Sequence, residues 1–432
     1  MQREANPIVI KSKLRAAFRE KLHLIILLGL LFIFSLSIPG ISYLVMIVIF
    51  VFISLPFIVQ TLSNKNRVKR SPIAIKFILS LIVLMGFLVT YFMTIYGYNF
   101  VDETTAVRGV ILAALSYIVG YSIHFEEIPS KTLNYIYVFL ALIGGGIIFV
   151  YLSVNSSSLG EILERSAPNF WKPGEDPING TVLDLYSMLG TGIIPIVFYG
   201  KNQQFKSQQY KLVTIISLAI GIISIHMSVL LQGRKAILSL VLVLLMTTLF
   251  KLKNVEEKNT RNLYFSIIVF ISLLLAIASD TIMSFAVANF EVFNRLQNEG
   301  LESGRYQAWF DIFDAMPRHF VGGRAFSISA SYAHNIWLDV FYDGGLLPMA
   351  LLLIFHILHI QPFLKVLSSK LPEPIIILTI CVIVPVLMGF QGEPVLQASS
   401  FYFSTSCCFL GSIVRLSQVA DKYNIDIPSD PL

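Results

Sequence analysis

The stretch AHNIWLDVFYDGG, residues 333–345, places a histidine, an asparagine and two aspartates directly before the apolar run 346–360. The imidazole of His334 can accept a proton near neutral pH, so it is a candidate general base. Asn335 is a good helix N-cap, which puts His334 at the entrance of a helix. Asp339 and Asp343 could orient the imidazole or cap neighbouring loops. A purely structural histidine is the alternative at this position.

A second candidate is the pair Arg234 and Lys235, which lies in a very short connection between the apolar stretches 212–232 and 236–250. An arginine at the centre of a membrane span costs about 2.5–3.5 kcal/mol, so two cations at this place need a reason. They could anchor the hairpin to lipid phosphates by snorkelling. Alternatively, they could form an anion site.

The segment 288–335 contains arginine but no lysine. Its arginines are Arg295, Arg305, Arg318 and Arg324. The planar fork of arginine grips phosphate oxygens through paired hydrogen bonds, which favours a phosphate ligand. In a long loop, however, such arginines can also be solvated or paired with acids such as Glu299 and Glu302.

Together these residues indicate one kind of chemistry. Arginines would hold a diphosphate, and the histidine would deprotonate an attacking hydroxyl. General-base assistance typically adds about 10²–10⁴ in rate. No cluster of Asp and Glu that would bind Mg²⁺ or Mn²⁺ is evident in the expected outer loops, so we expect no metal and assign the electrostatic work to the cations.

The composition predicts which scaffold must position these residues. The chain has 432 residues, of which 55% are hydrophobic and only 13% charged, against roughly 25% charged in soluble domains. A membrane-spanning helix needs about 20 apolar residues. The sequence therefore predicts an all-α polytopic membrane protein with about 12 spans, because the runs are too long for barrel strands. The expected spans are 22–38, 41–62, 73–96, 107–125, 133–152, 181–199, 212–232, 236–250, 263–287, 338–360, 375–391 and 399–416.

Lysine and arginine predict the orientation of these spans. The first 21 residues carry six of them, and the segments 63–72, 200–211 and 251–261 carry four, three and four. By the positive-inside rule, both termini are cytoplasmic. The external loops would be 153–180 and 288–335 of a single membrane domain, residues 1–432. The net charge of +6 follows from this topology, so we infer no nucleic-acid partner.

Within the larger external loop, RYQAWFDIFDAM places aromatic residues at helical spacing. Tyr306, Trp309, Phe310 and Phe313 predict an amphipathic helix that lies on the outer membrane surface. Pro317 should end this helix, and the following VGGRAF should form a turn.

Three pieces of the chain, in this order, resemble the O-antigen polymerase and O-antigen ligase superfamily. They are QGRKAILSLVLVLL, SGRYQAWFDIFDAMPRHFVGGRAF and AHNIWLDVFYDGGLLPMALLL, which lie within residues 225–360. The resemblance implies that Arg234 and Arg305 bind a diphosphate and that His334 is the catalytic base. Lys235, Arg324, Asn335 and Tyr306 could assist them.

The resemblance also implies a C-type, inverting, metal-independent glycosyltransferase without cofactors in the bacterial inner membrane, with its active site on the periplasmic face. Its donor would be a glycan on undecaprenyl diphosphate. A polymerase would transfer this glycan to another lipid-linked repeat, and a chain-length regulator could join it. A ligase would transfer the glycan to lipid A core. A lipid-linked glycan flippase is the alternative from a different class.

Overall fold

The computed structural model describes eight parts of the chain. They are residues 72–122, 132–155, 166–167, 178–199, 207–230, 234–254, 305–398 and 400–425. The expected spans 22–38, 41–62 and 263–287 lie outside these residues, as do Arg295, Glu299 and Glu302. The backbone of every candidate site residue lies within the described parts.

These parts are almost entirely helical. The helices are α4 (Pro72–Gly97), α5 (Glu103–Ser122), α6 (Thr132–Asn155), α8 (Gly180–Gly192), α9 (Pro195–Tyr199), α10 (Ser207–Leu230), α11 (Arg234–Asn254), α15 (Arg305–Ala315), α16 (Ile336–Gly344), α17 (Leu346–Leu367), α18 (Glu373–Gly392), α19 (Val395–Ala398) and α20 (Ser400–Ile425). The two short strands β1 (Ser166–Ala167) and β2 (Ile178–Asn179) pair antiparallel. This small hairpin lies in the segment 153–180, whose first residues continue α6.

Five of the described helices are long and apolar enough to cross a membrane. The candidate spans are Ile75–Gly97, Tyr210–Leu230, Lys235–Leu252, Leu346–Leu367 and Glu373–Gly392. A backbone in hydrocarbon must satisfy its own hydrogen bonds, which a helix does within one segment. The expectation of an α-helical membrane protein is therefore confirmed at this level.

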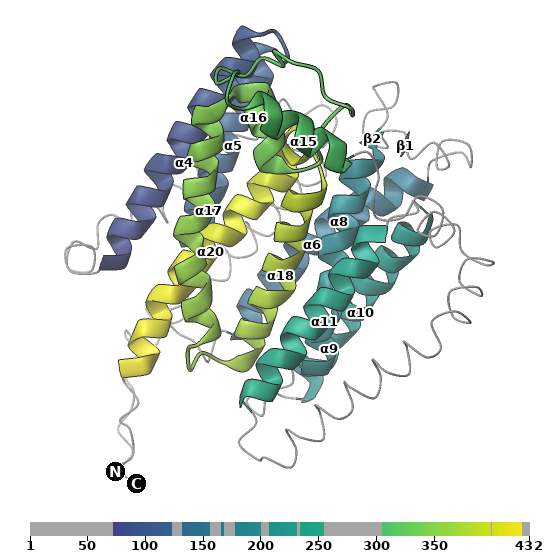
Figure 1. Ribbon diagram of the computed structural model, residues 1–432. Coiled ribbons are helices and arrows are strands. Elements are labelled where there is room, and N and C mark those ends of the chain that lie inside the picture. Colours follow the sequence, from purple (N-terminus) through teal and green to yellow (C-terminus); the bar gives the residue numbers. More distant parts are fainter. Residues whose placement is uncertain are drawn as a thin grey trace, which may run out of the picture.

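The helices form a bundle whose long members run roughly side by side (Figure 1). Helices α4, α5, α17 and α20 pack together in one part, and α6, α8, α10, α11 and α18 in the other. The closest packing joins α5 to α20, where Gly120 and Gly411 let the backbones meet. A Cβ atom at Gly120 would come within 1.9 Å of the Cys408 carbonyl oxygen, so only glycine allows this approach.

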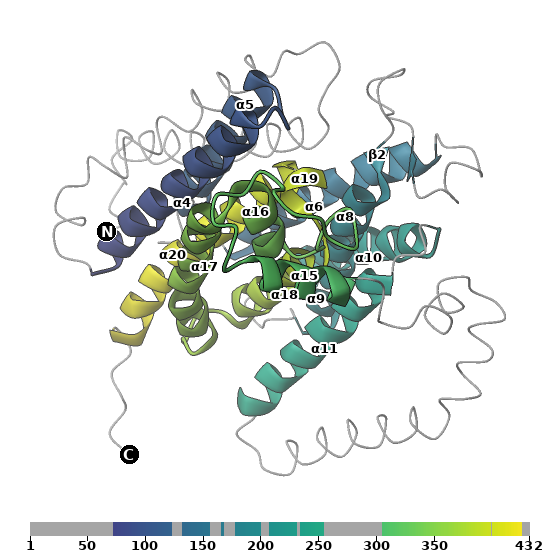
Figure 2. The ribbon, with the colours of Figure 1, turned by 45° about the horizontal axis from the view of Figure 1, so that its top comes forward.

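At one end of the bundle, the short helices α15, α16 and α19 and the segment that joins α15 to α16 cover the ends of the long helices (Figures 1 and 2). Two backbone hydrogen bonds fix this joining segment: Gly323 N donates to Asp343 O at 2.8 Å, and Leu346 N donates to Phe320 O at 2.9 Å. We name residues 305–345 the cap.

The span expected over 338–360 begins later in the structure, at Leu346. The chain instead forms the short helix α16 in the cap and the spanning helix α17, separated by Gly345. Gly345 has a φ of 90°, and a Cβ atom there would lie 2.5 Å from the Phe320 carbonyl oxygen. Because only glycine adopts this conformation at little cost, the helix must break here.

The expected span 181–199 is also interrupted, into α8 and α9. The break falls at Ile193 and Ile194, directly before Pro195. Proline has no backbone N–H and disfavours helical geometry in the residue before it, which accounts for the new helix start.

The expected amphipathic helix is confirmed as α15, and Met316–Arg318 turn away from it as Pro317 predicts. Phe310 and Phe313 are exposed, whereas Trp309 is partly buried and donates from its indole nitrogen to Ala333 O at 2.7 Å. The sequence grouped all these aromatic residues on one face. In the structure, Trp309 instead holds the helix against the loop before α16.

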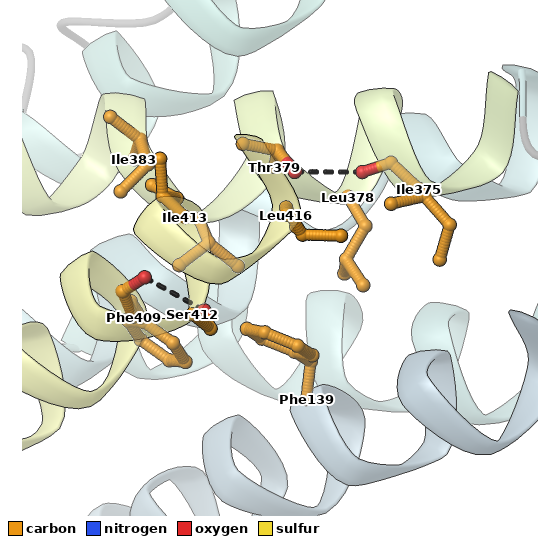
Figure 3. Close-up of a pocket in the computed structure, with 10 residues that line it drawn as sticks. Phe139, Ile375, Leu378, Thr379, Ile383, Phe409, Ser412, Ile413 and Leu416 are labelled. Atoms are coloured by element: carbon orange, nitrogen blue, oxygen red, sulfur yellow. Dashed lines mark hydrogen bonds between the residues drawn. The ribbon is translucent and has the colours of Figure 1, made fainter. Parts of the chain in front are cut away.

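A small cavity between α6, α18 and α20 carries no sign of ligand chemistry (Figure 3). Its only polar lining side chains are Thr379 and Ser412. Each donates its hydroxyl to a carbonyl of its own helix, Ile375 O at 2.8 Å and Phe409 O at 2.7 Å. With these donors satisfied, the cavity is a packing gap in the core.

Candidate functional site

The loop before α16 holds His334 in a fixed position. His334 has a φ of 55°, an uncommon conformation for a residue other than glycine. On either side of it, Ala333 N and Asn335 N donate to the two carboxylate oxygens of Asp339, at 2.7 and 3.0 Å. Asp339 therefore clamps the backbone on both sides of the imidazole.

Asn335 is the N-cap of α16, as the sequence predicted. Its side-chain oxygen accepts from Trp337 N and Leu338 N, each at 3.2 Å. These bonds satisfy two of the free N–H groups at the helix start. The side-chain oxygen of Asn335 therefore caps α16, and this N-cap fixes where the helix begins, directly after His334 and Asn335.

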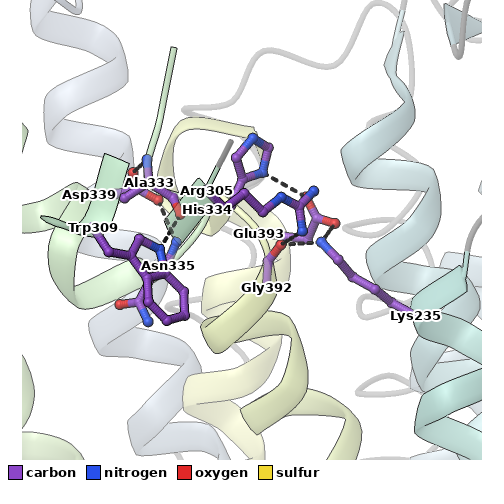
Figure 4. A network of polar contacts seen from close by, with 9 residues as sticks. All are labelled: Lys235, Arg305, Trp309, Ala333, His334, Asn335, Asp339, Gly392 and Glu393. Atoms are coloured by element: carbon purple, nitrogen blue, oxygen red, sulfur yellow. Dashed lines mark hydrogen bonds and ion pairs between the residues drawn. The ribbon is translucent and has the colours of Figure 1, made fainter. Parts of the chain in front are cut away.

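Four elements bring their polar side chains together at the cap end of the bundle (Figure 4). Lys235 comes from the start of α11, and Arg305 is the first residue of α15. His334 precedes α16, and Glu393 directly follows α18. Residues far apart in the sequence thus meet in one network.

Glu393 lies at the centre of this network and is only 3% exposed. Lys235 Nζ donates to one of its carboxylate oxygens, Oε1, and also to Gly392 O. Arg305 Nη1 lies 3.4 Å from the same carbonyl oxygen. The other carboxylate oxygen, Oε2, lies 3.5 Å from His334 Nδ1. Each carboxylate oxygen therefore faces a different nitrogen.

The neighbouring nitrogen groups favour the ionised form of Glu393. Burial alone would raise the pKa of the Glu393 carboxyl, but Lys235, His334 and Arg305 lower it to about 2. A lowered pKa in the folded state means that this group stabilises the fold above its ordinary value of 4.5. That stabilisation is lost as the pH falls toward 2.

Asp339 has the opposite tendency. Burial raises the pKa of its carboxyl to about 8, although two backbone N–H groups oppose that shift. Asp343 and Glu393 add to the rise through charge repulsion. A negative charge is therefore costly at Asp339 and well supported at Glu393, so Glu393 is the carboxylate that balances the cations.

Arg324 does not join this network. It has a φ of 54°, and its Nε donates to Asp343 Oδ1 at 2.8 Å. Its guanidinium lies 4.6 Å from the centre of the Phe100 ring. The other oxygen of Asp343, Oδ2, accepts from Gln397 Nε2 at 2.7 Å. Arg324 thus belongs to a neighbouring cluster that ties the cap to the segment after α4 and to α19.

The other residues expected at the site have mixed outcomes. Lys235, expected only as a helper, contacts the central carboxylate directly. Tyr306 is 47% exposed, and its ring packs edge-on against Trp309. Arg234 begins α11, but its side chain lies outside the described residues.

Sequence reasoning missed Glu393. It is the only charged residue between Gly392 and Ser400, and it stands between two apolar stretches. The sequence did hold one indication of its role. Glu393 is an isolated acid beside a span, on the side expected to carry Arg234 and Lys235. Its role depends on a contact across more than 150 residues, which no local pattern contains.

The arrangement can bind an anion and move a proton. Two cations and an imidazole converge around the Glu393 carboxylate. Across the described parts of the chain, no group of three or more His, Cys, Asp or Glu side chains is placed to hold a metal.

Comparison with known proteins adds no family. The chain matches no protein-family model, and no curated protein matches it.

Proposed function

We propose that this chain is a membrane glycosyltransferase that uses a glycan linked to undecaprenyl diphosphate, and specifically an O-antigen polymerase. The observation that carries the proposal is the convergence of Lys235, Arg305 and His334 around buried Glu393. Lys235 and His334 contact its carboxylate, and Arg305 reaches the adjacent Gly392 carbonyl. These residues belong to the three separate motifs that resemble this superfamily. The proposal includes about 12 spans, a C-type arrangement and a periplasmic site.

In the proposed reaction, His334 removes the proton from an acceptor sugar hydroxyl. The hydroxyl oxygen then attacks the anomeric carbon of the donor, and the bond from that carbon to the diphosphate oxygen breaks. Undecaprenyl diphosphate leaves with the electron pair. Attack from the face opposite the leaving group inverts the anomeric configuration.

The cations stabilise the leaving group in this scheme. Two unit charges 4 Å apart interact by about 4 kcal/mol at an effective dielectric near 20. Arg305, Lys235 and Arg234 would together offset the charge that develops on the diphosphate. Such preorganised charge stabilisation replaces the metal ion that many phosphate-handling enzymes use.

The decisive experiment uses the purified full-length protein in liposomes. The donor is the lipid-linked glycan extracted from source cells that lack this protein, where the unused substrate should accumulate. A polymerase transfers the glycan from one lipid to the repeat on another, so longer lipid-linked glycans form from the donor alone. A ligase forms no product until lipid A core is added. EDTA should leave the rate unchanged.

Movement of the lipid-linked glycan across the bilayer without any new glycosidic bond would refute the enzyme proposal and favour a flippase. Loss of activity in EDTA that Mg²⁺ restores would contradict the metal-independent mechanism. Transfer to lipid A core alone would replace the polymerase by the ligase.

A further inference from the structure

Glu393 occupies the place where an incoming diphosphate would find its cations. Its Oε1 accepts from Lys235, and Arg305 shares the adjacent Gly392 carbonyl with the same lysine. A carboxylate carries one negative charge and a diphosphate more, so the two compete for these cations. The structure therefore holds the cationic site closed by an internal anion.

The imidazole beside this carboxylate makes only a long contact with it. His334 Nδ1 is buried and makes no hydrogen bond within the described residues. Glu393 Oε2 is 3.5 Å away, beyond the range of about 2.7–3.2 Å for a good N–H···O hydrogen bond. A buried, unmade hydrogen bond is costly, so this gap calls for an explanation.

The backbone on both sides of the gap is fixed, so any adjustment falls to the side chains. Glu393 N donates to Gly389 O at 3.0 Å as the C-cap of α18, and Val395 N donates to Glu393 O at 2.9 Å. On the other side, Asp339 holds the N–H groups that flank His334. A rotation that moves the Glu393 carboxylate by a few tenths of an ångström is enough to close the contact.

We propose that Glu393 is a positioning residue that exchanges partners when the donor binds. The diphosphate takes over Lys235 and Arg305, and the released carboxylate closes onto the Nδ1–H of His334. A hydrogen bond at Nδ1 decides which ring nitrogen carries the proton, so Nε2 is left free to act as the base. Donor binding thereby switches on the base. This inference rests on the proposed function.

The test separates binding from chemistry in the Glu393→Gln variant. An amide keeps the shape of the side chain and removes its charge. We expect kcat for glycan transfer to fall by about 10²-fold or more, within the range of general-base effects. Affinity for undecaprenyl diphosphate, the binding probe, should rise by up to about tenfold, because the internal competitor is gone.

Glu373→Gln is the matched control. Glu373 lies at the opposite end of α18, where it pairs with Lys251. The Glu373→Gln substitution should change neither kcat nor the affinity for undecaprenyl diphosphate. Glu393→Asp, which keeps the charge on a shorter side chain, should recover part of the lost kcat, and it decides the question if the glutamine variant does not fold.

Weaker binding of undecaprenyl diphosphate in Glu393→Gln, with kcat unchanged, would overturn the inference, because Glu393 would then only hold the cations in place. No change in either quantity would overturn it as well. If the wild-type protein transfers no glycan, the proposed function fails separately. The affinity comparison still reports whether Glu393 competes for the cations.

Discussion

Arg305 is the residue for which charge and shape can be separated by a single substitution. Its guanidinium reaches the Gly392 carbonyl from the first position of α15 and contributes to the low pKa of Glu393. Lysine would keep the positive charge, but it cannot donate two parallel hydrogen bonds to a phosphate. At this position, therefore, Arg-to-Lys is not a conservative change.

We expect Arg305→Lys to lower the rate of glycan transfer by about tenfold or more, the scale of one lost charge-assisted hydrogen bond. Initial rates with saturating acceptor measure the effect. Arg318→Lys is the control, because Arg318 lies just beyond the other end of α15, 67% exposed, and pairs with Asp314. Equal rates for wild type and Arg305→Lys would mean that the site needs only a positive charge.

At the scale of elements, the cap depends on glycine. Gly322, Gly323 and Gly345 all have positive φ, and they let residues 320–324 lie against the turn between α16 and α17. A Cβ atom at Gly323 would come within 2.4 Å of the Tyr98 ring. The cap that positions His334 is therefore built on backbone conformations that other residues adopt only with strain.

Gly345→Ala should destabilise the protein, because a positive φ alone costs about 1–2 kcal/mol and the added carbon also meets Phe320 O. Thermal unfolding in detergent is the measurement, and a fall in Tm together with lost transfer is expected. Gly97→Ala serves for comparison, since a Cβ atom there meets nothing within 4 Å. A Gly345→Ala protein as stable as wild type would show that the cap tolerates a rearranged turn.

Local patterns predicted the elements better than they predicted the site. The Asn335 cap, the helix α15 and the turn after Pro317 follow from residues within a few positions of each other, and all are present. The start of the span after Gly345 was placed too early, at residue 338 instead of Leu346, because the apolar residues on both sides of the glycine resemble one long span. Glu393 could not be placed, since its partners come from α11, α15 and the loop before α16.

At the scale of the whole molecule, the cap must lie outside the cytoplasm for the proposed reaction to take place there. The ends of α11 and α18 that carry Lys235 and Glu393 are on the cap side, whereas Lys251 and Glu373 mark the opposite side. The positive-inside rule predicts that the opposite side faces the cytoplasm. A site that receives an outward-facing lipid diphosphate needs this orientation.

Cysteine labelling tests the orientation. The three native cysteines, Cys381, Cys407 and Cys408, are buried and should give little background. Val321→Cys, at a position 72% exposed in the cap, should react with a membrane-impermeant maleimide in cells whose inner membrane is intact. Ser368→Cys, exposed after α17 at the opposite end, should react only after lysis. The reverse pattern would place the site in the cytoplasm and end the proposal.

The most direct measurement is glycan transfer by purified His334→Ala protein in liposomes, with binding of undecaprenyl diphosphate measured on the same preparation. His334 supplies the base and none of the cations, so transfer should fall by about 10²–10⁴-fold while the diphosphate still binds. Transfer at the wild-type rate by this variant would contradict the account.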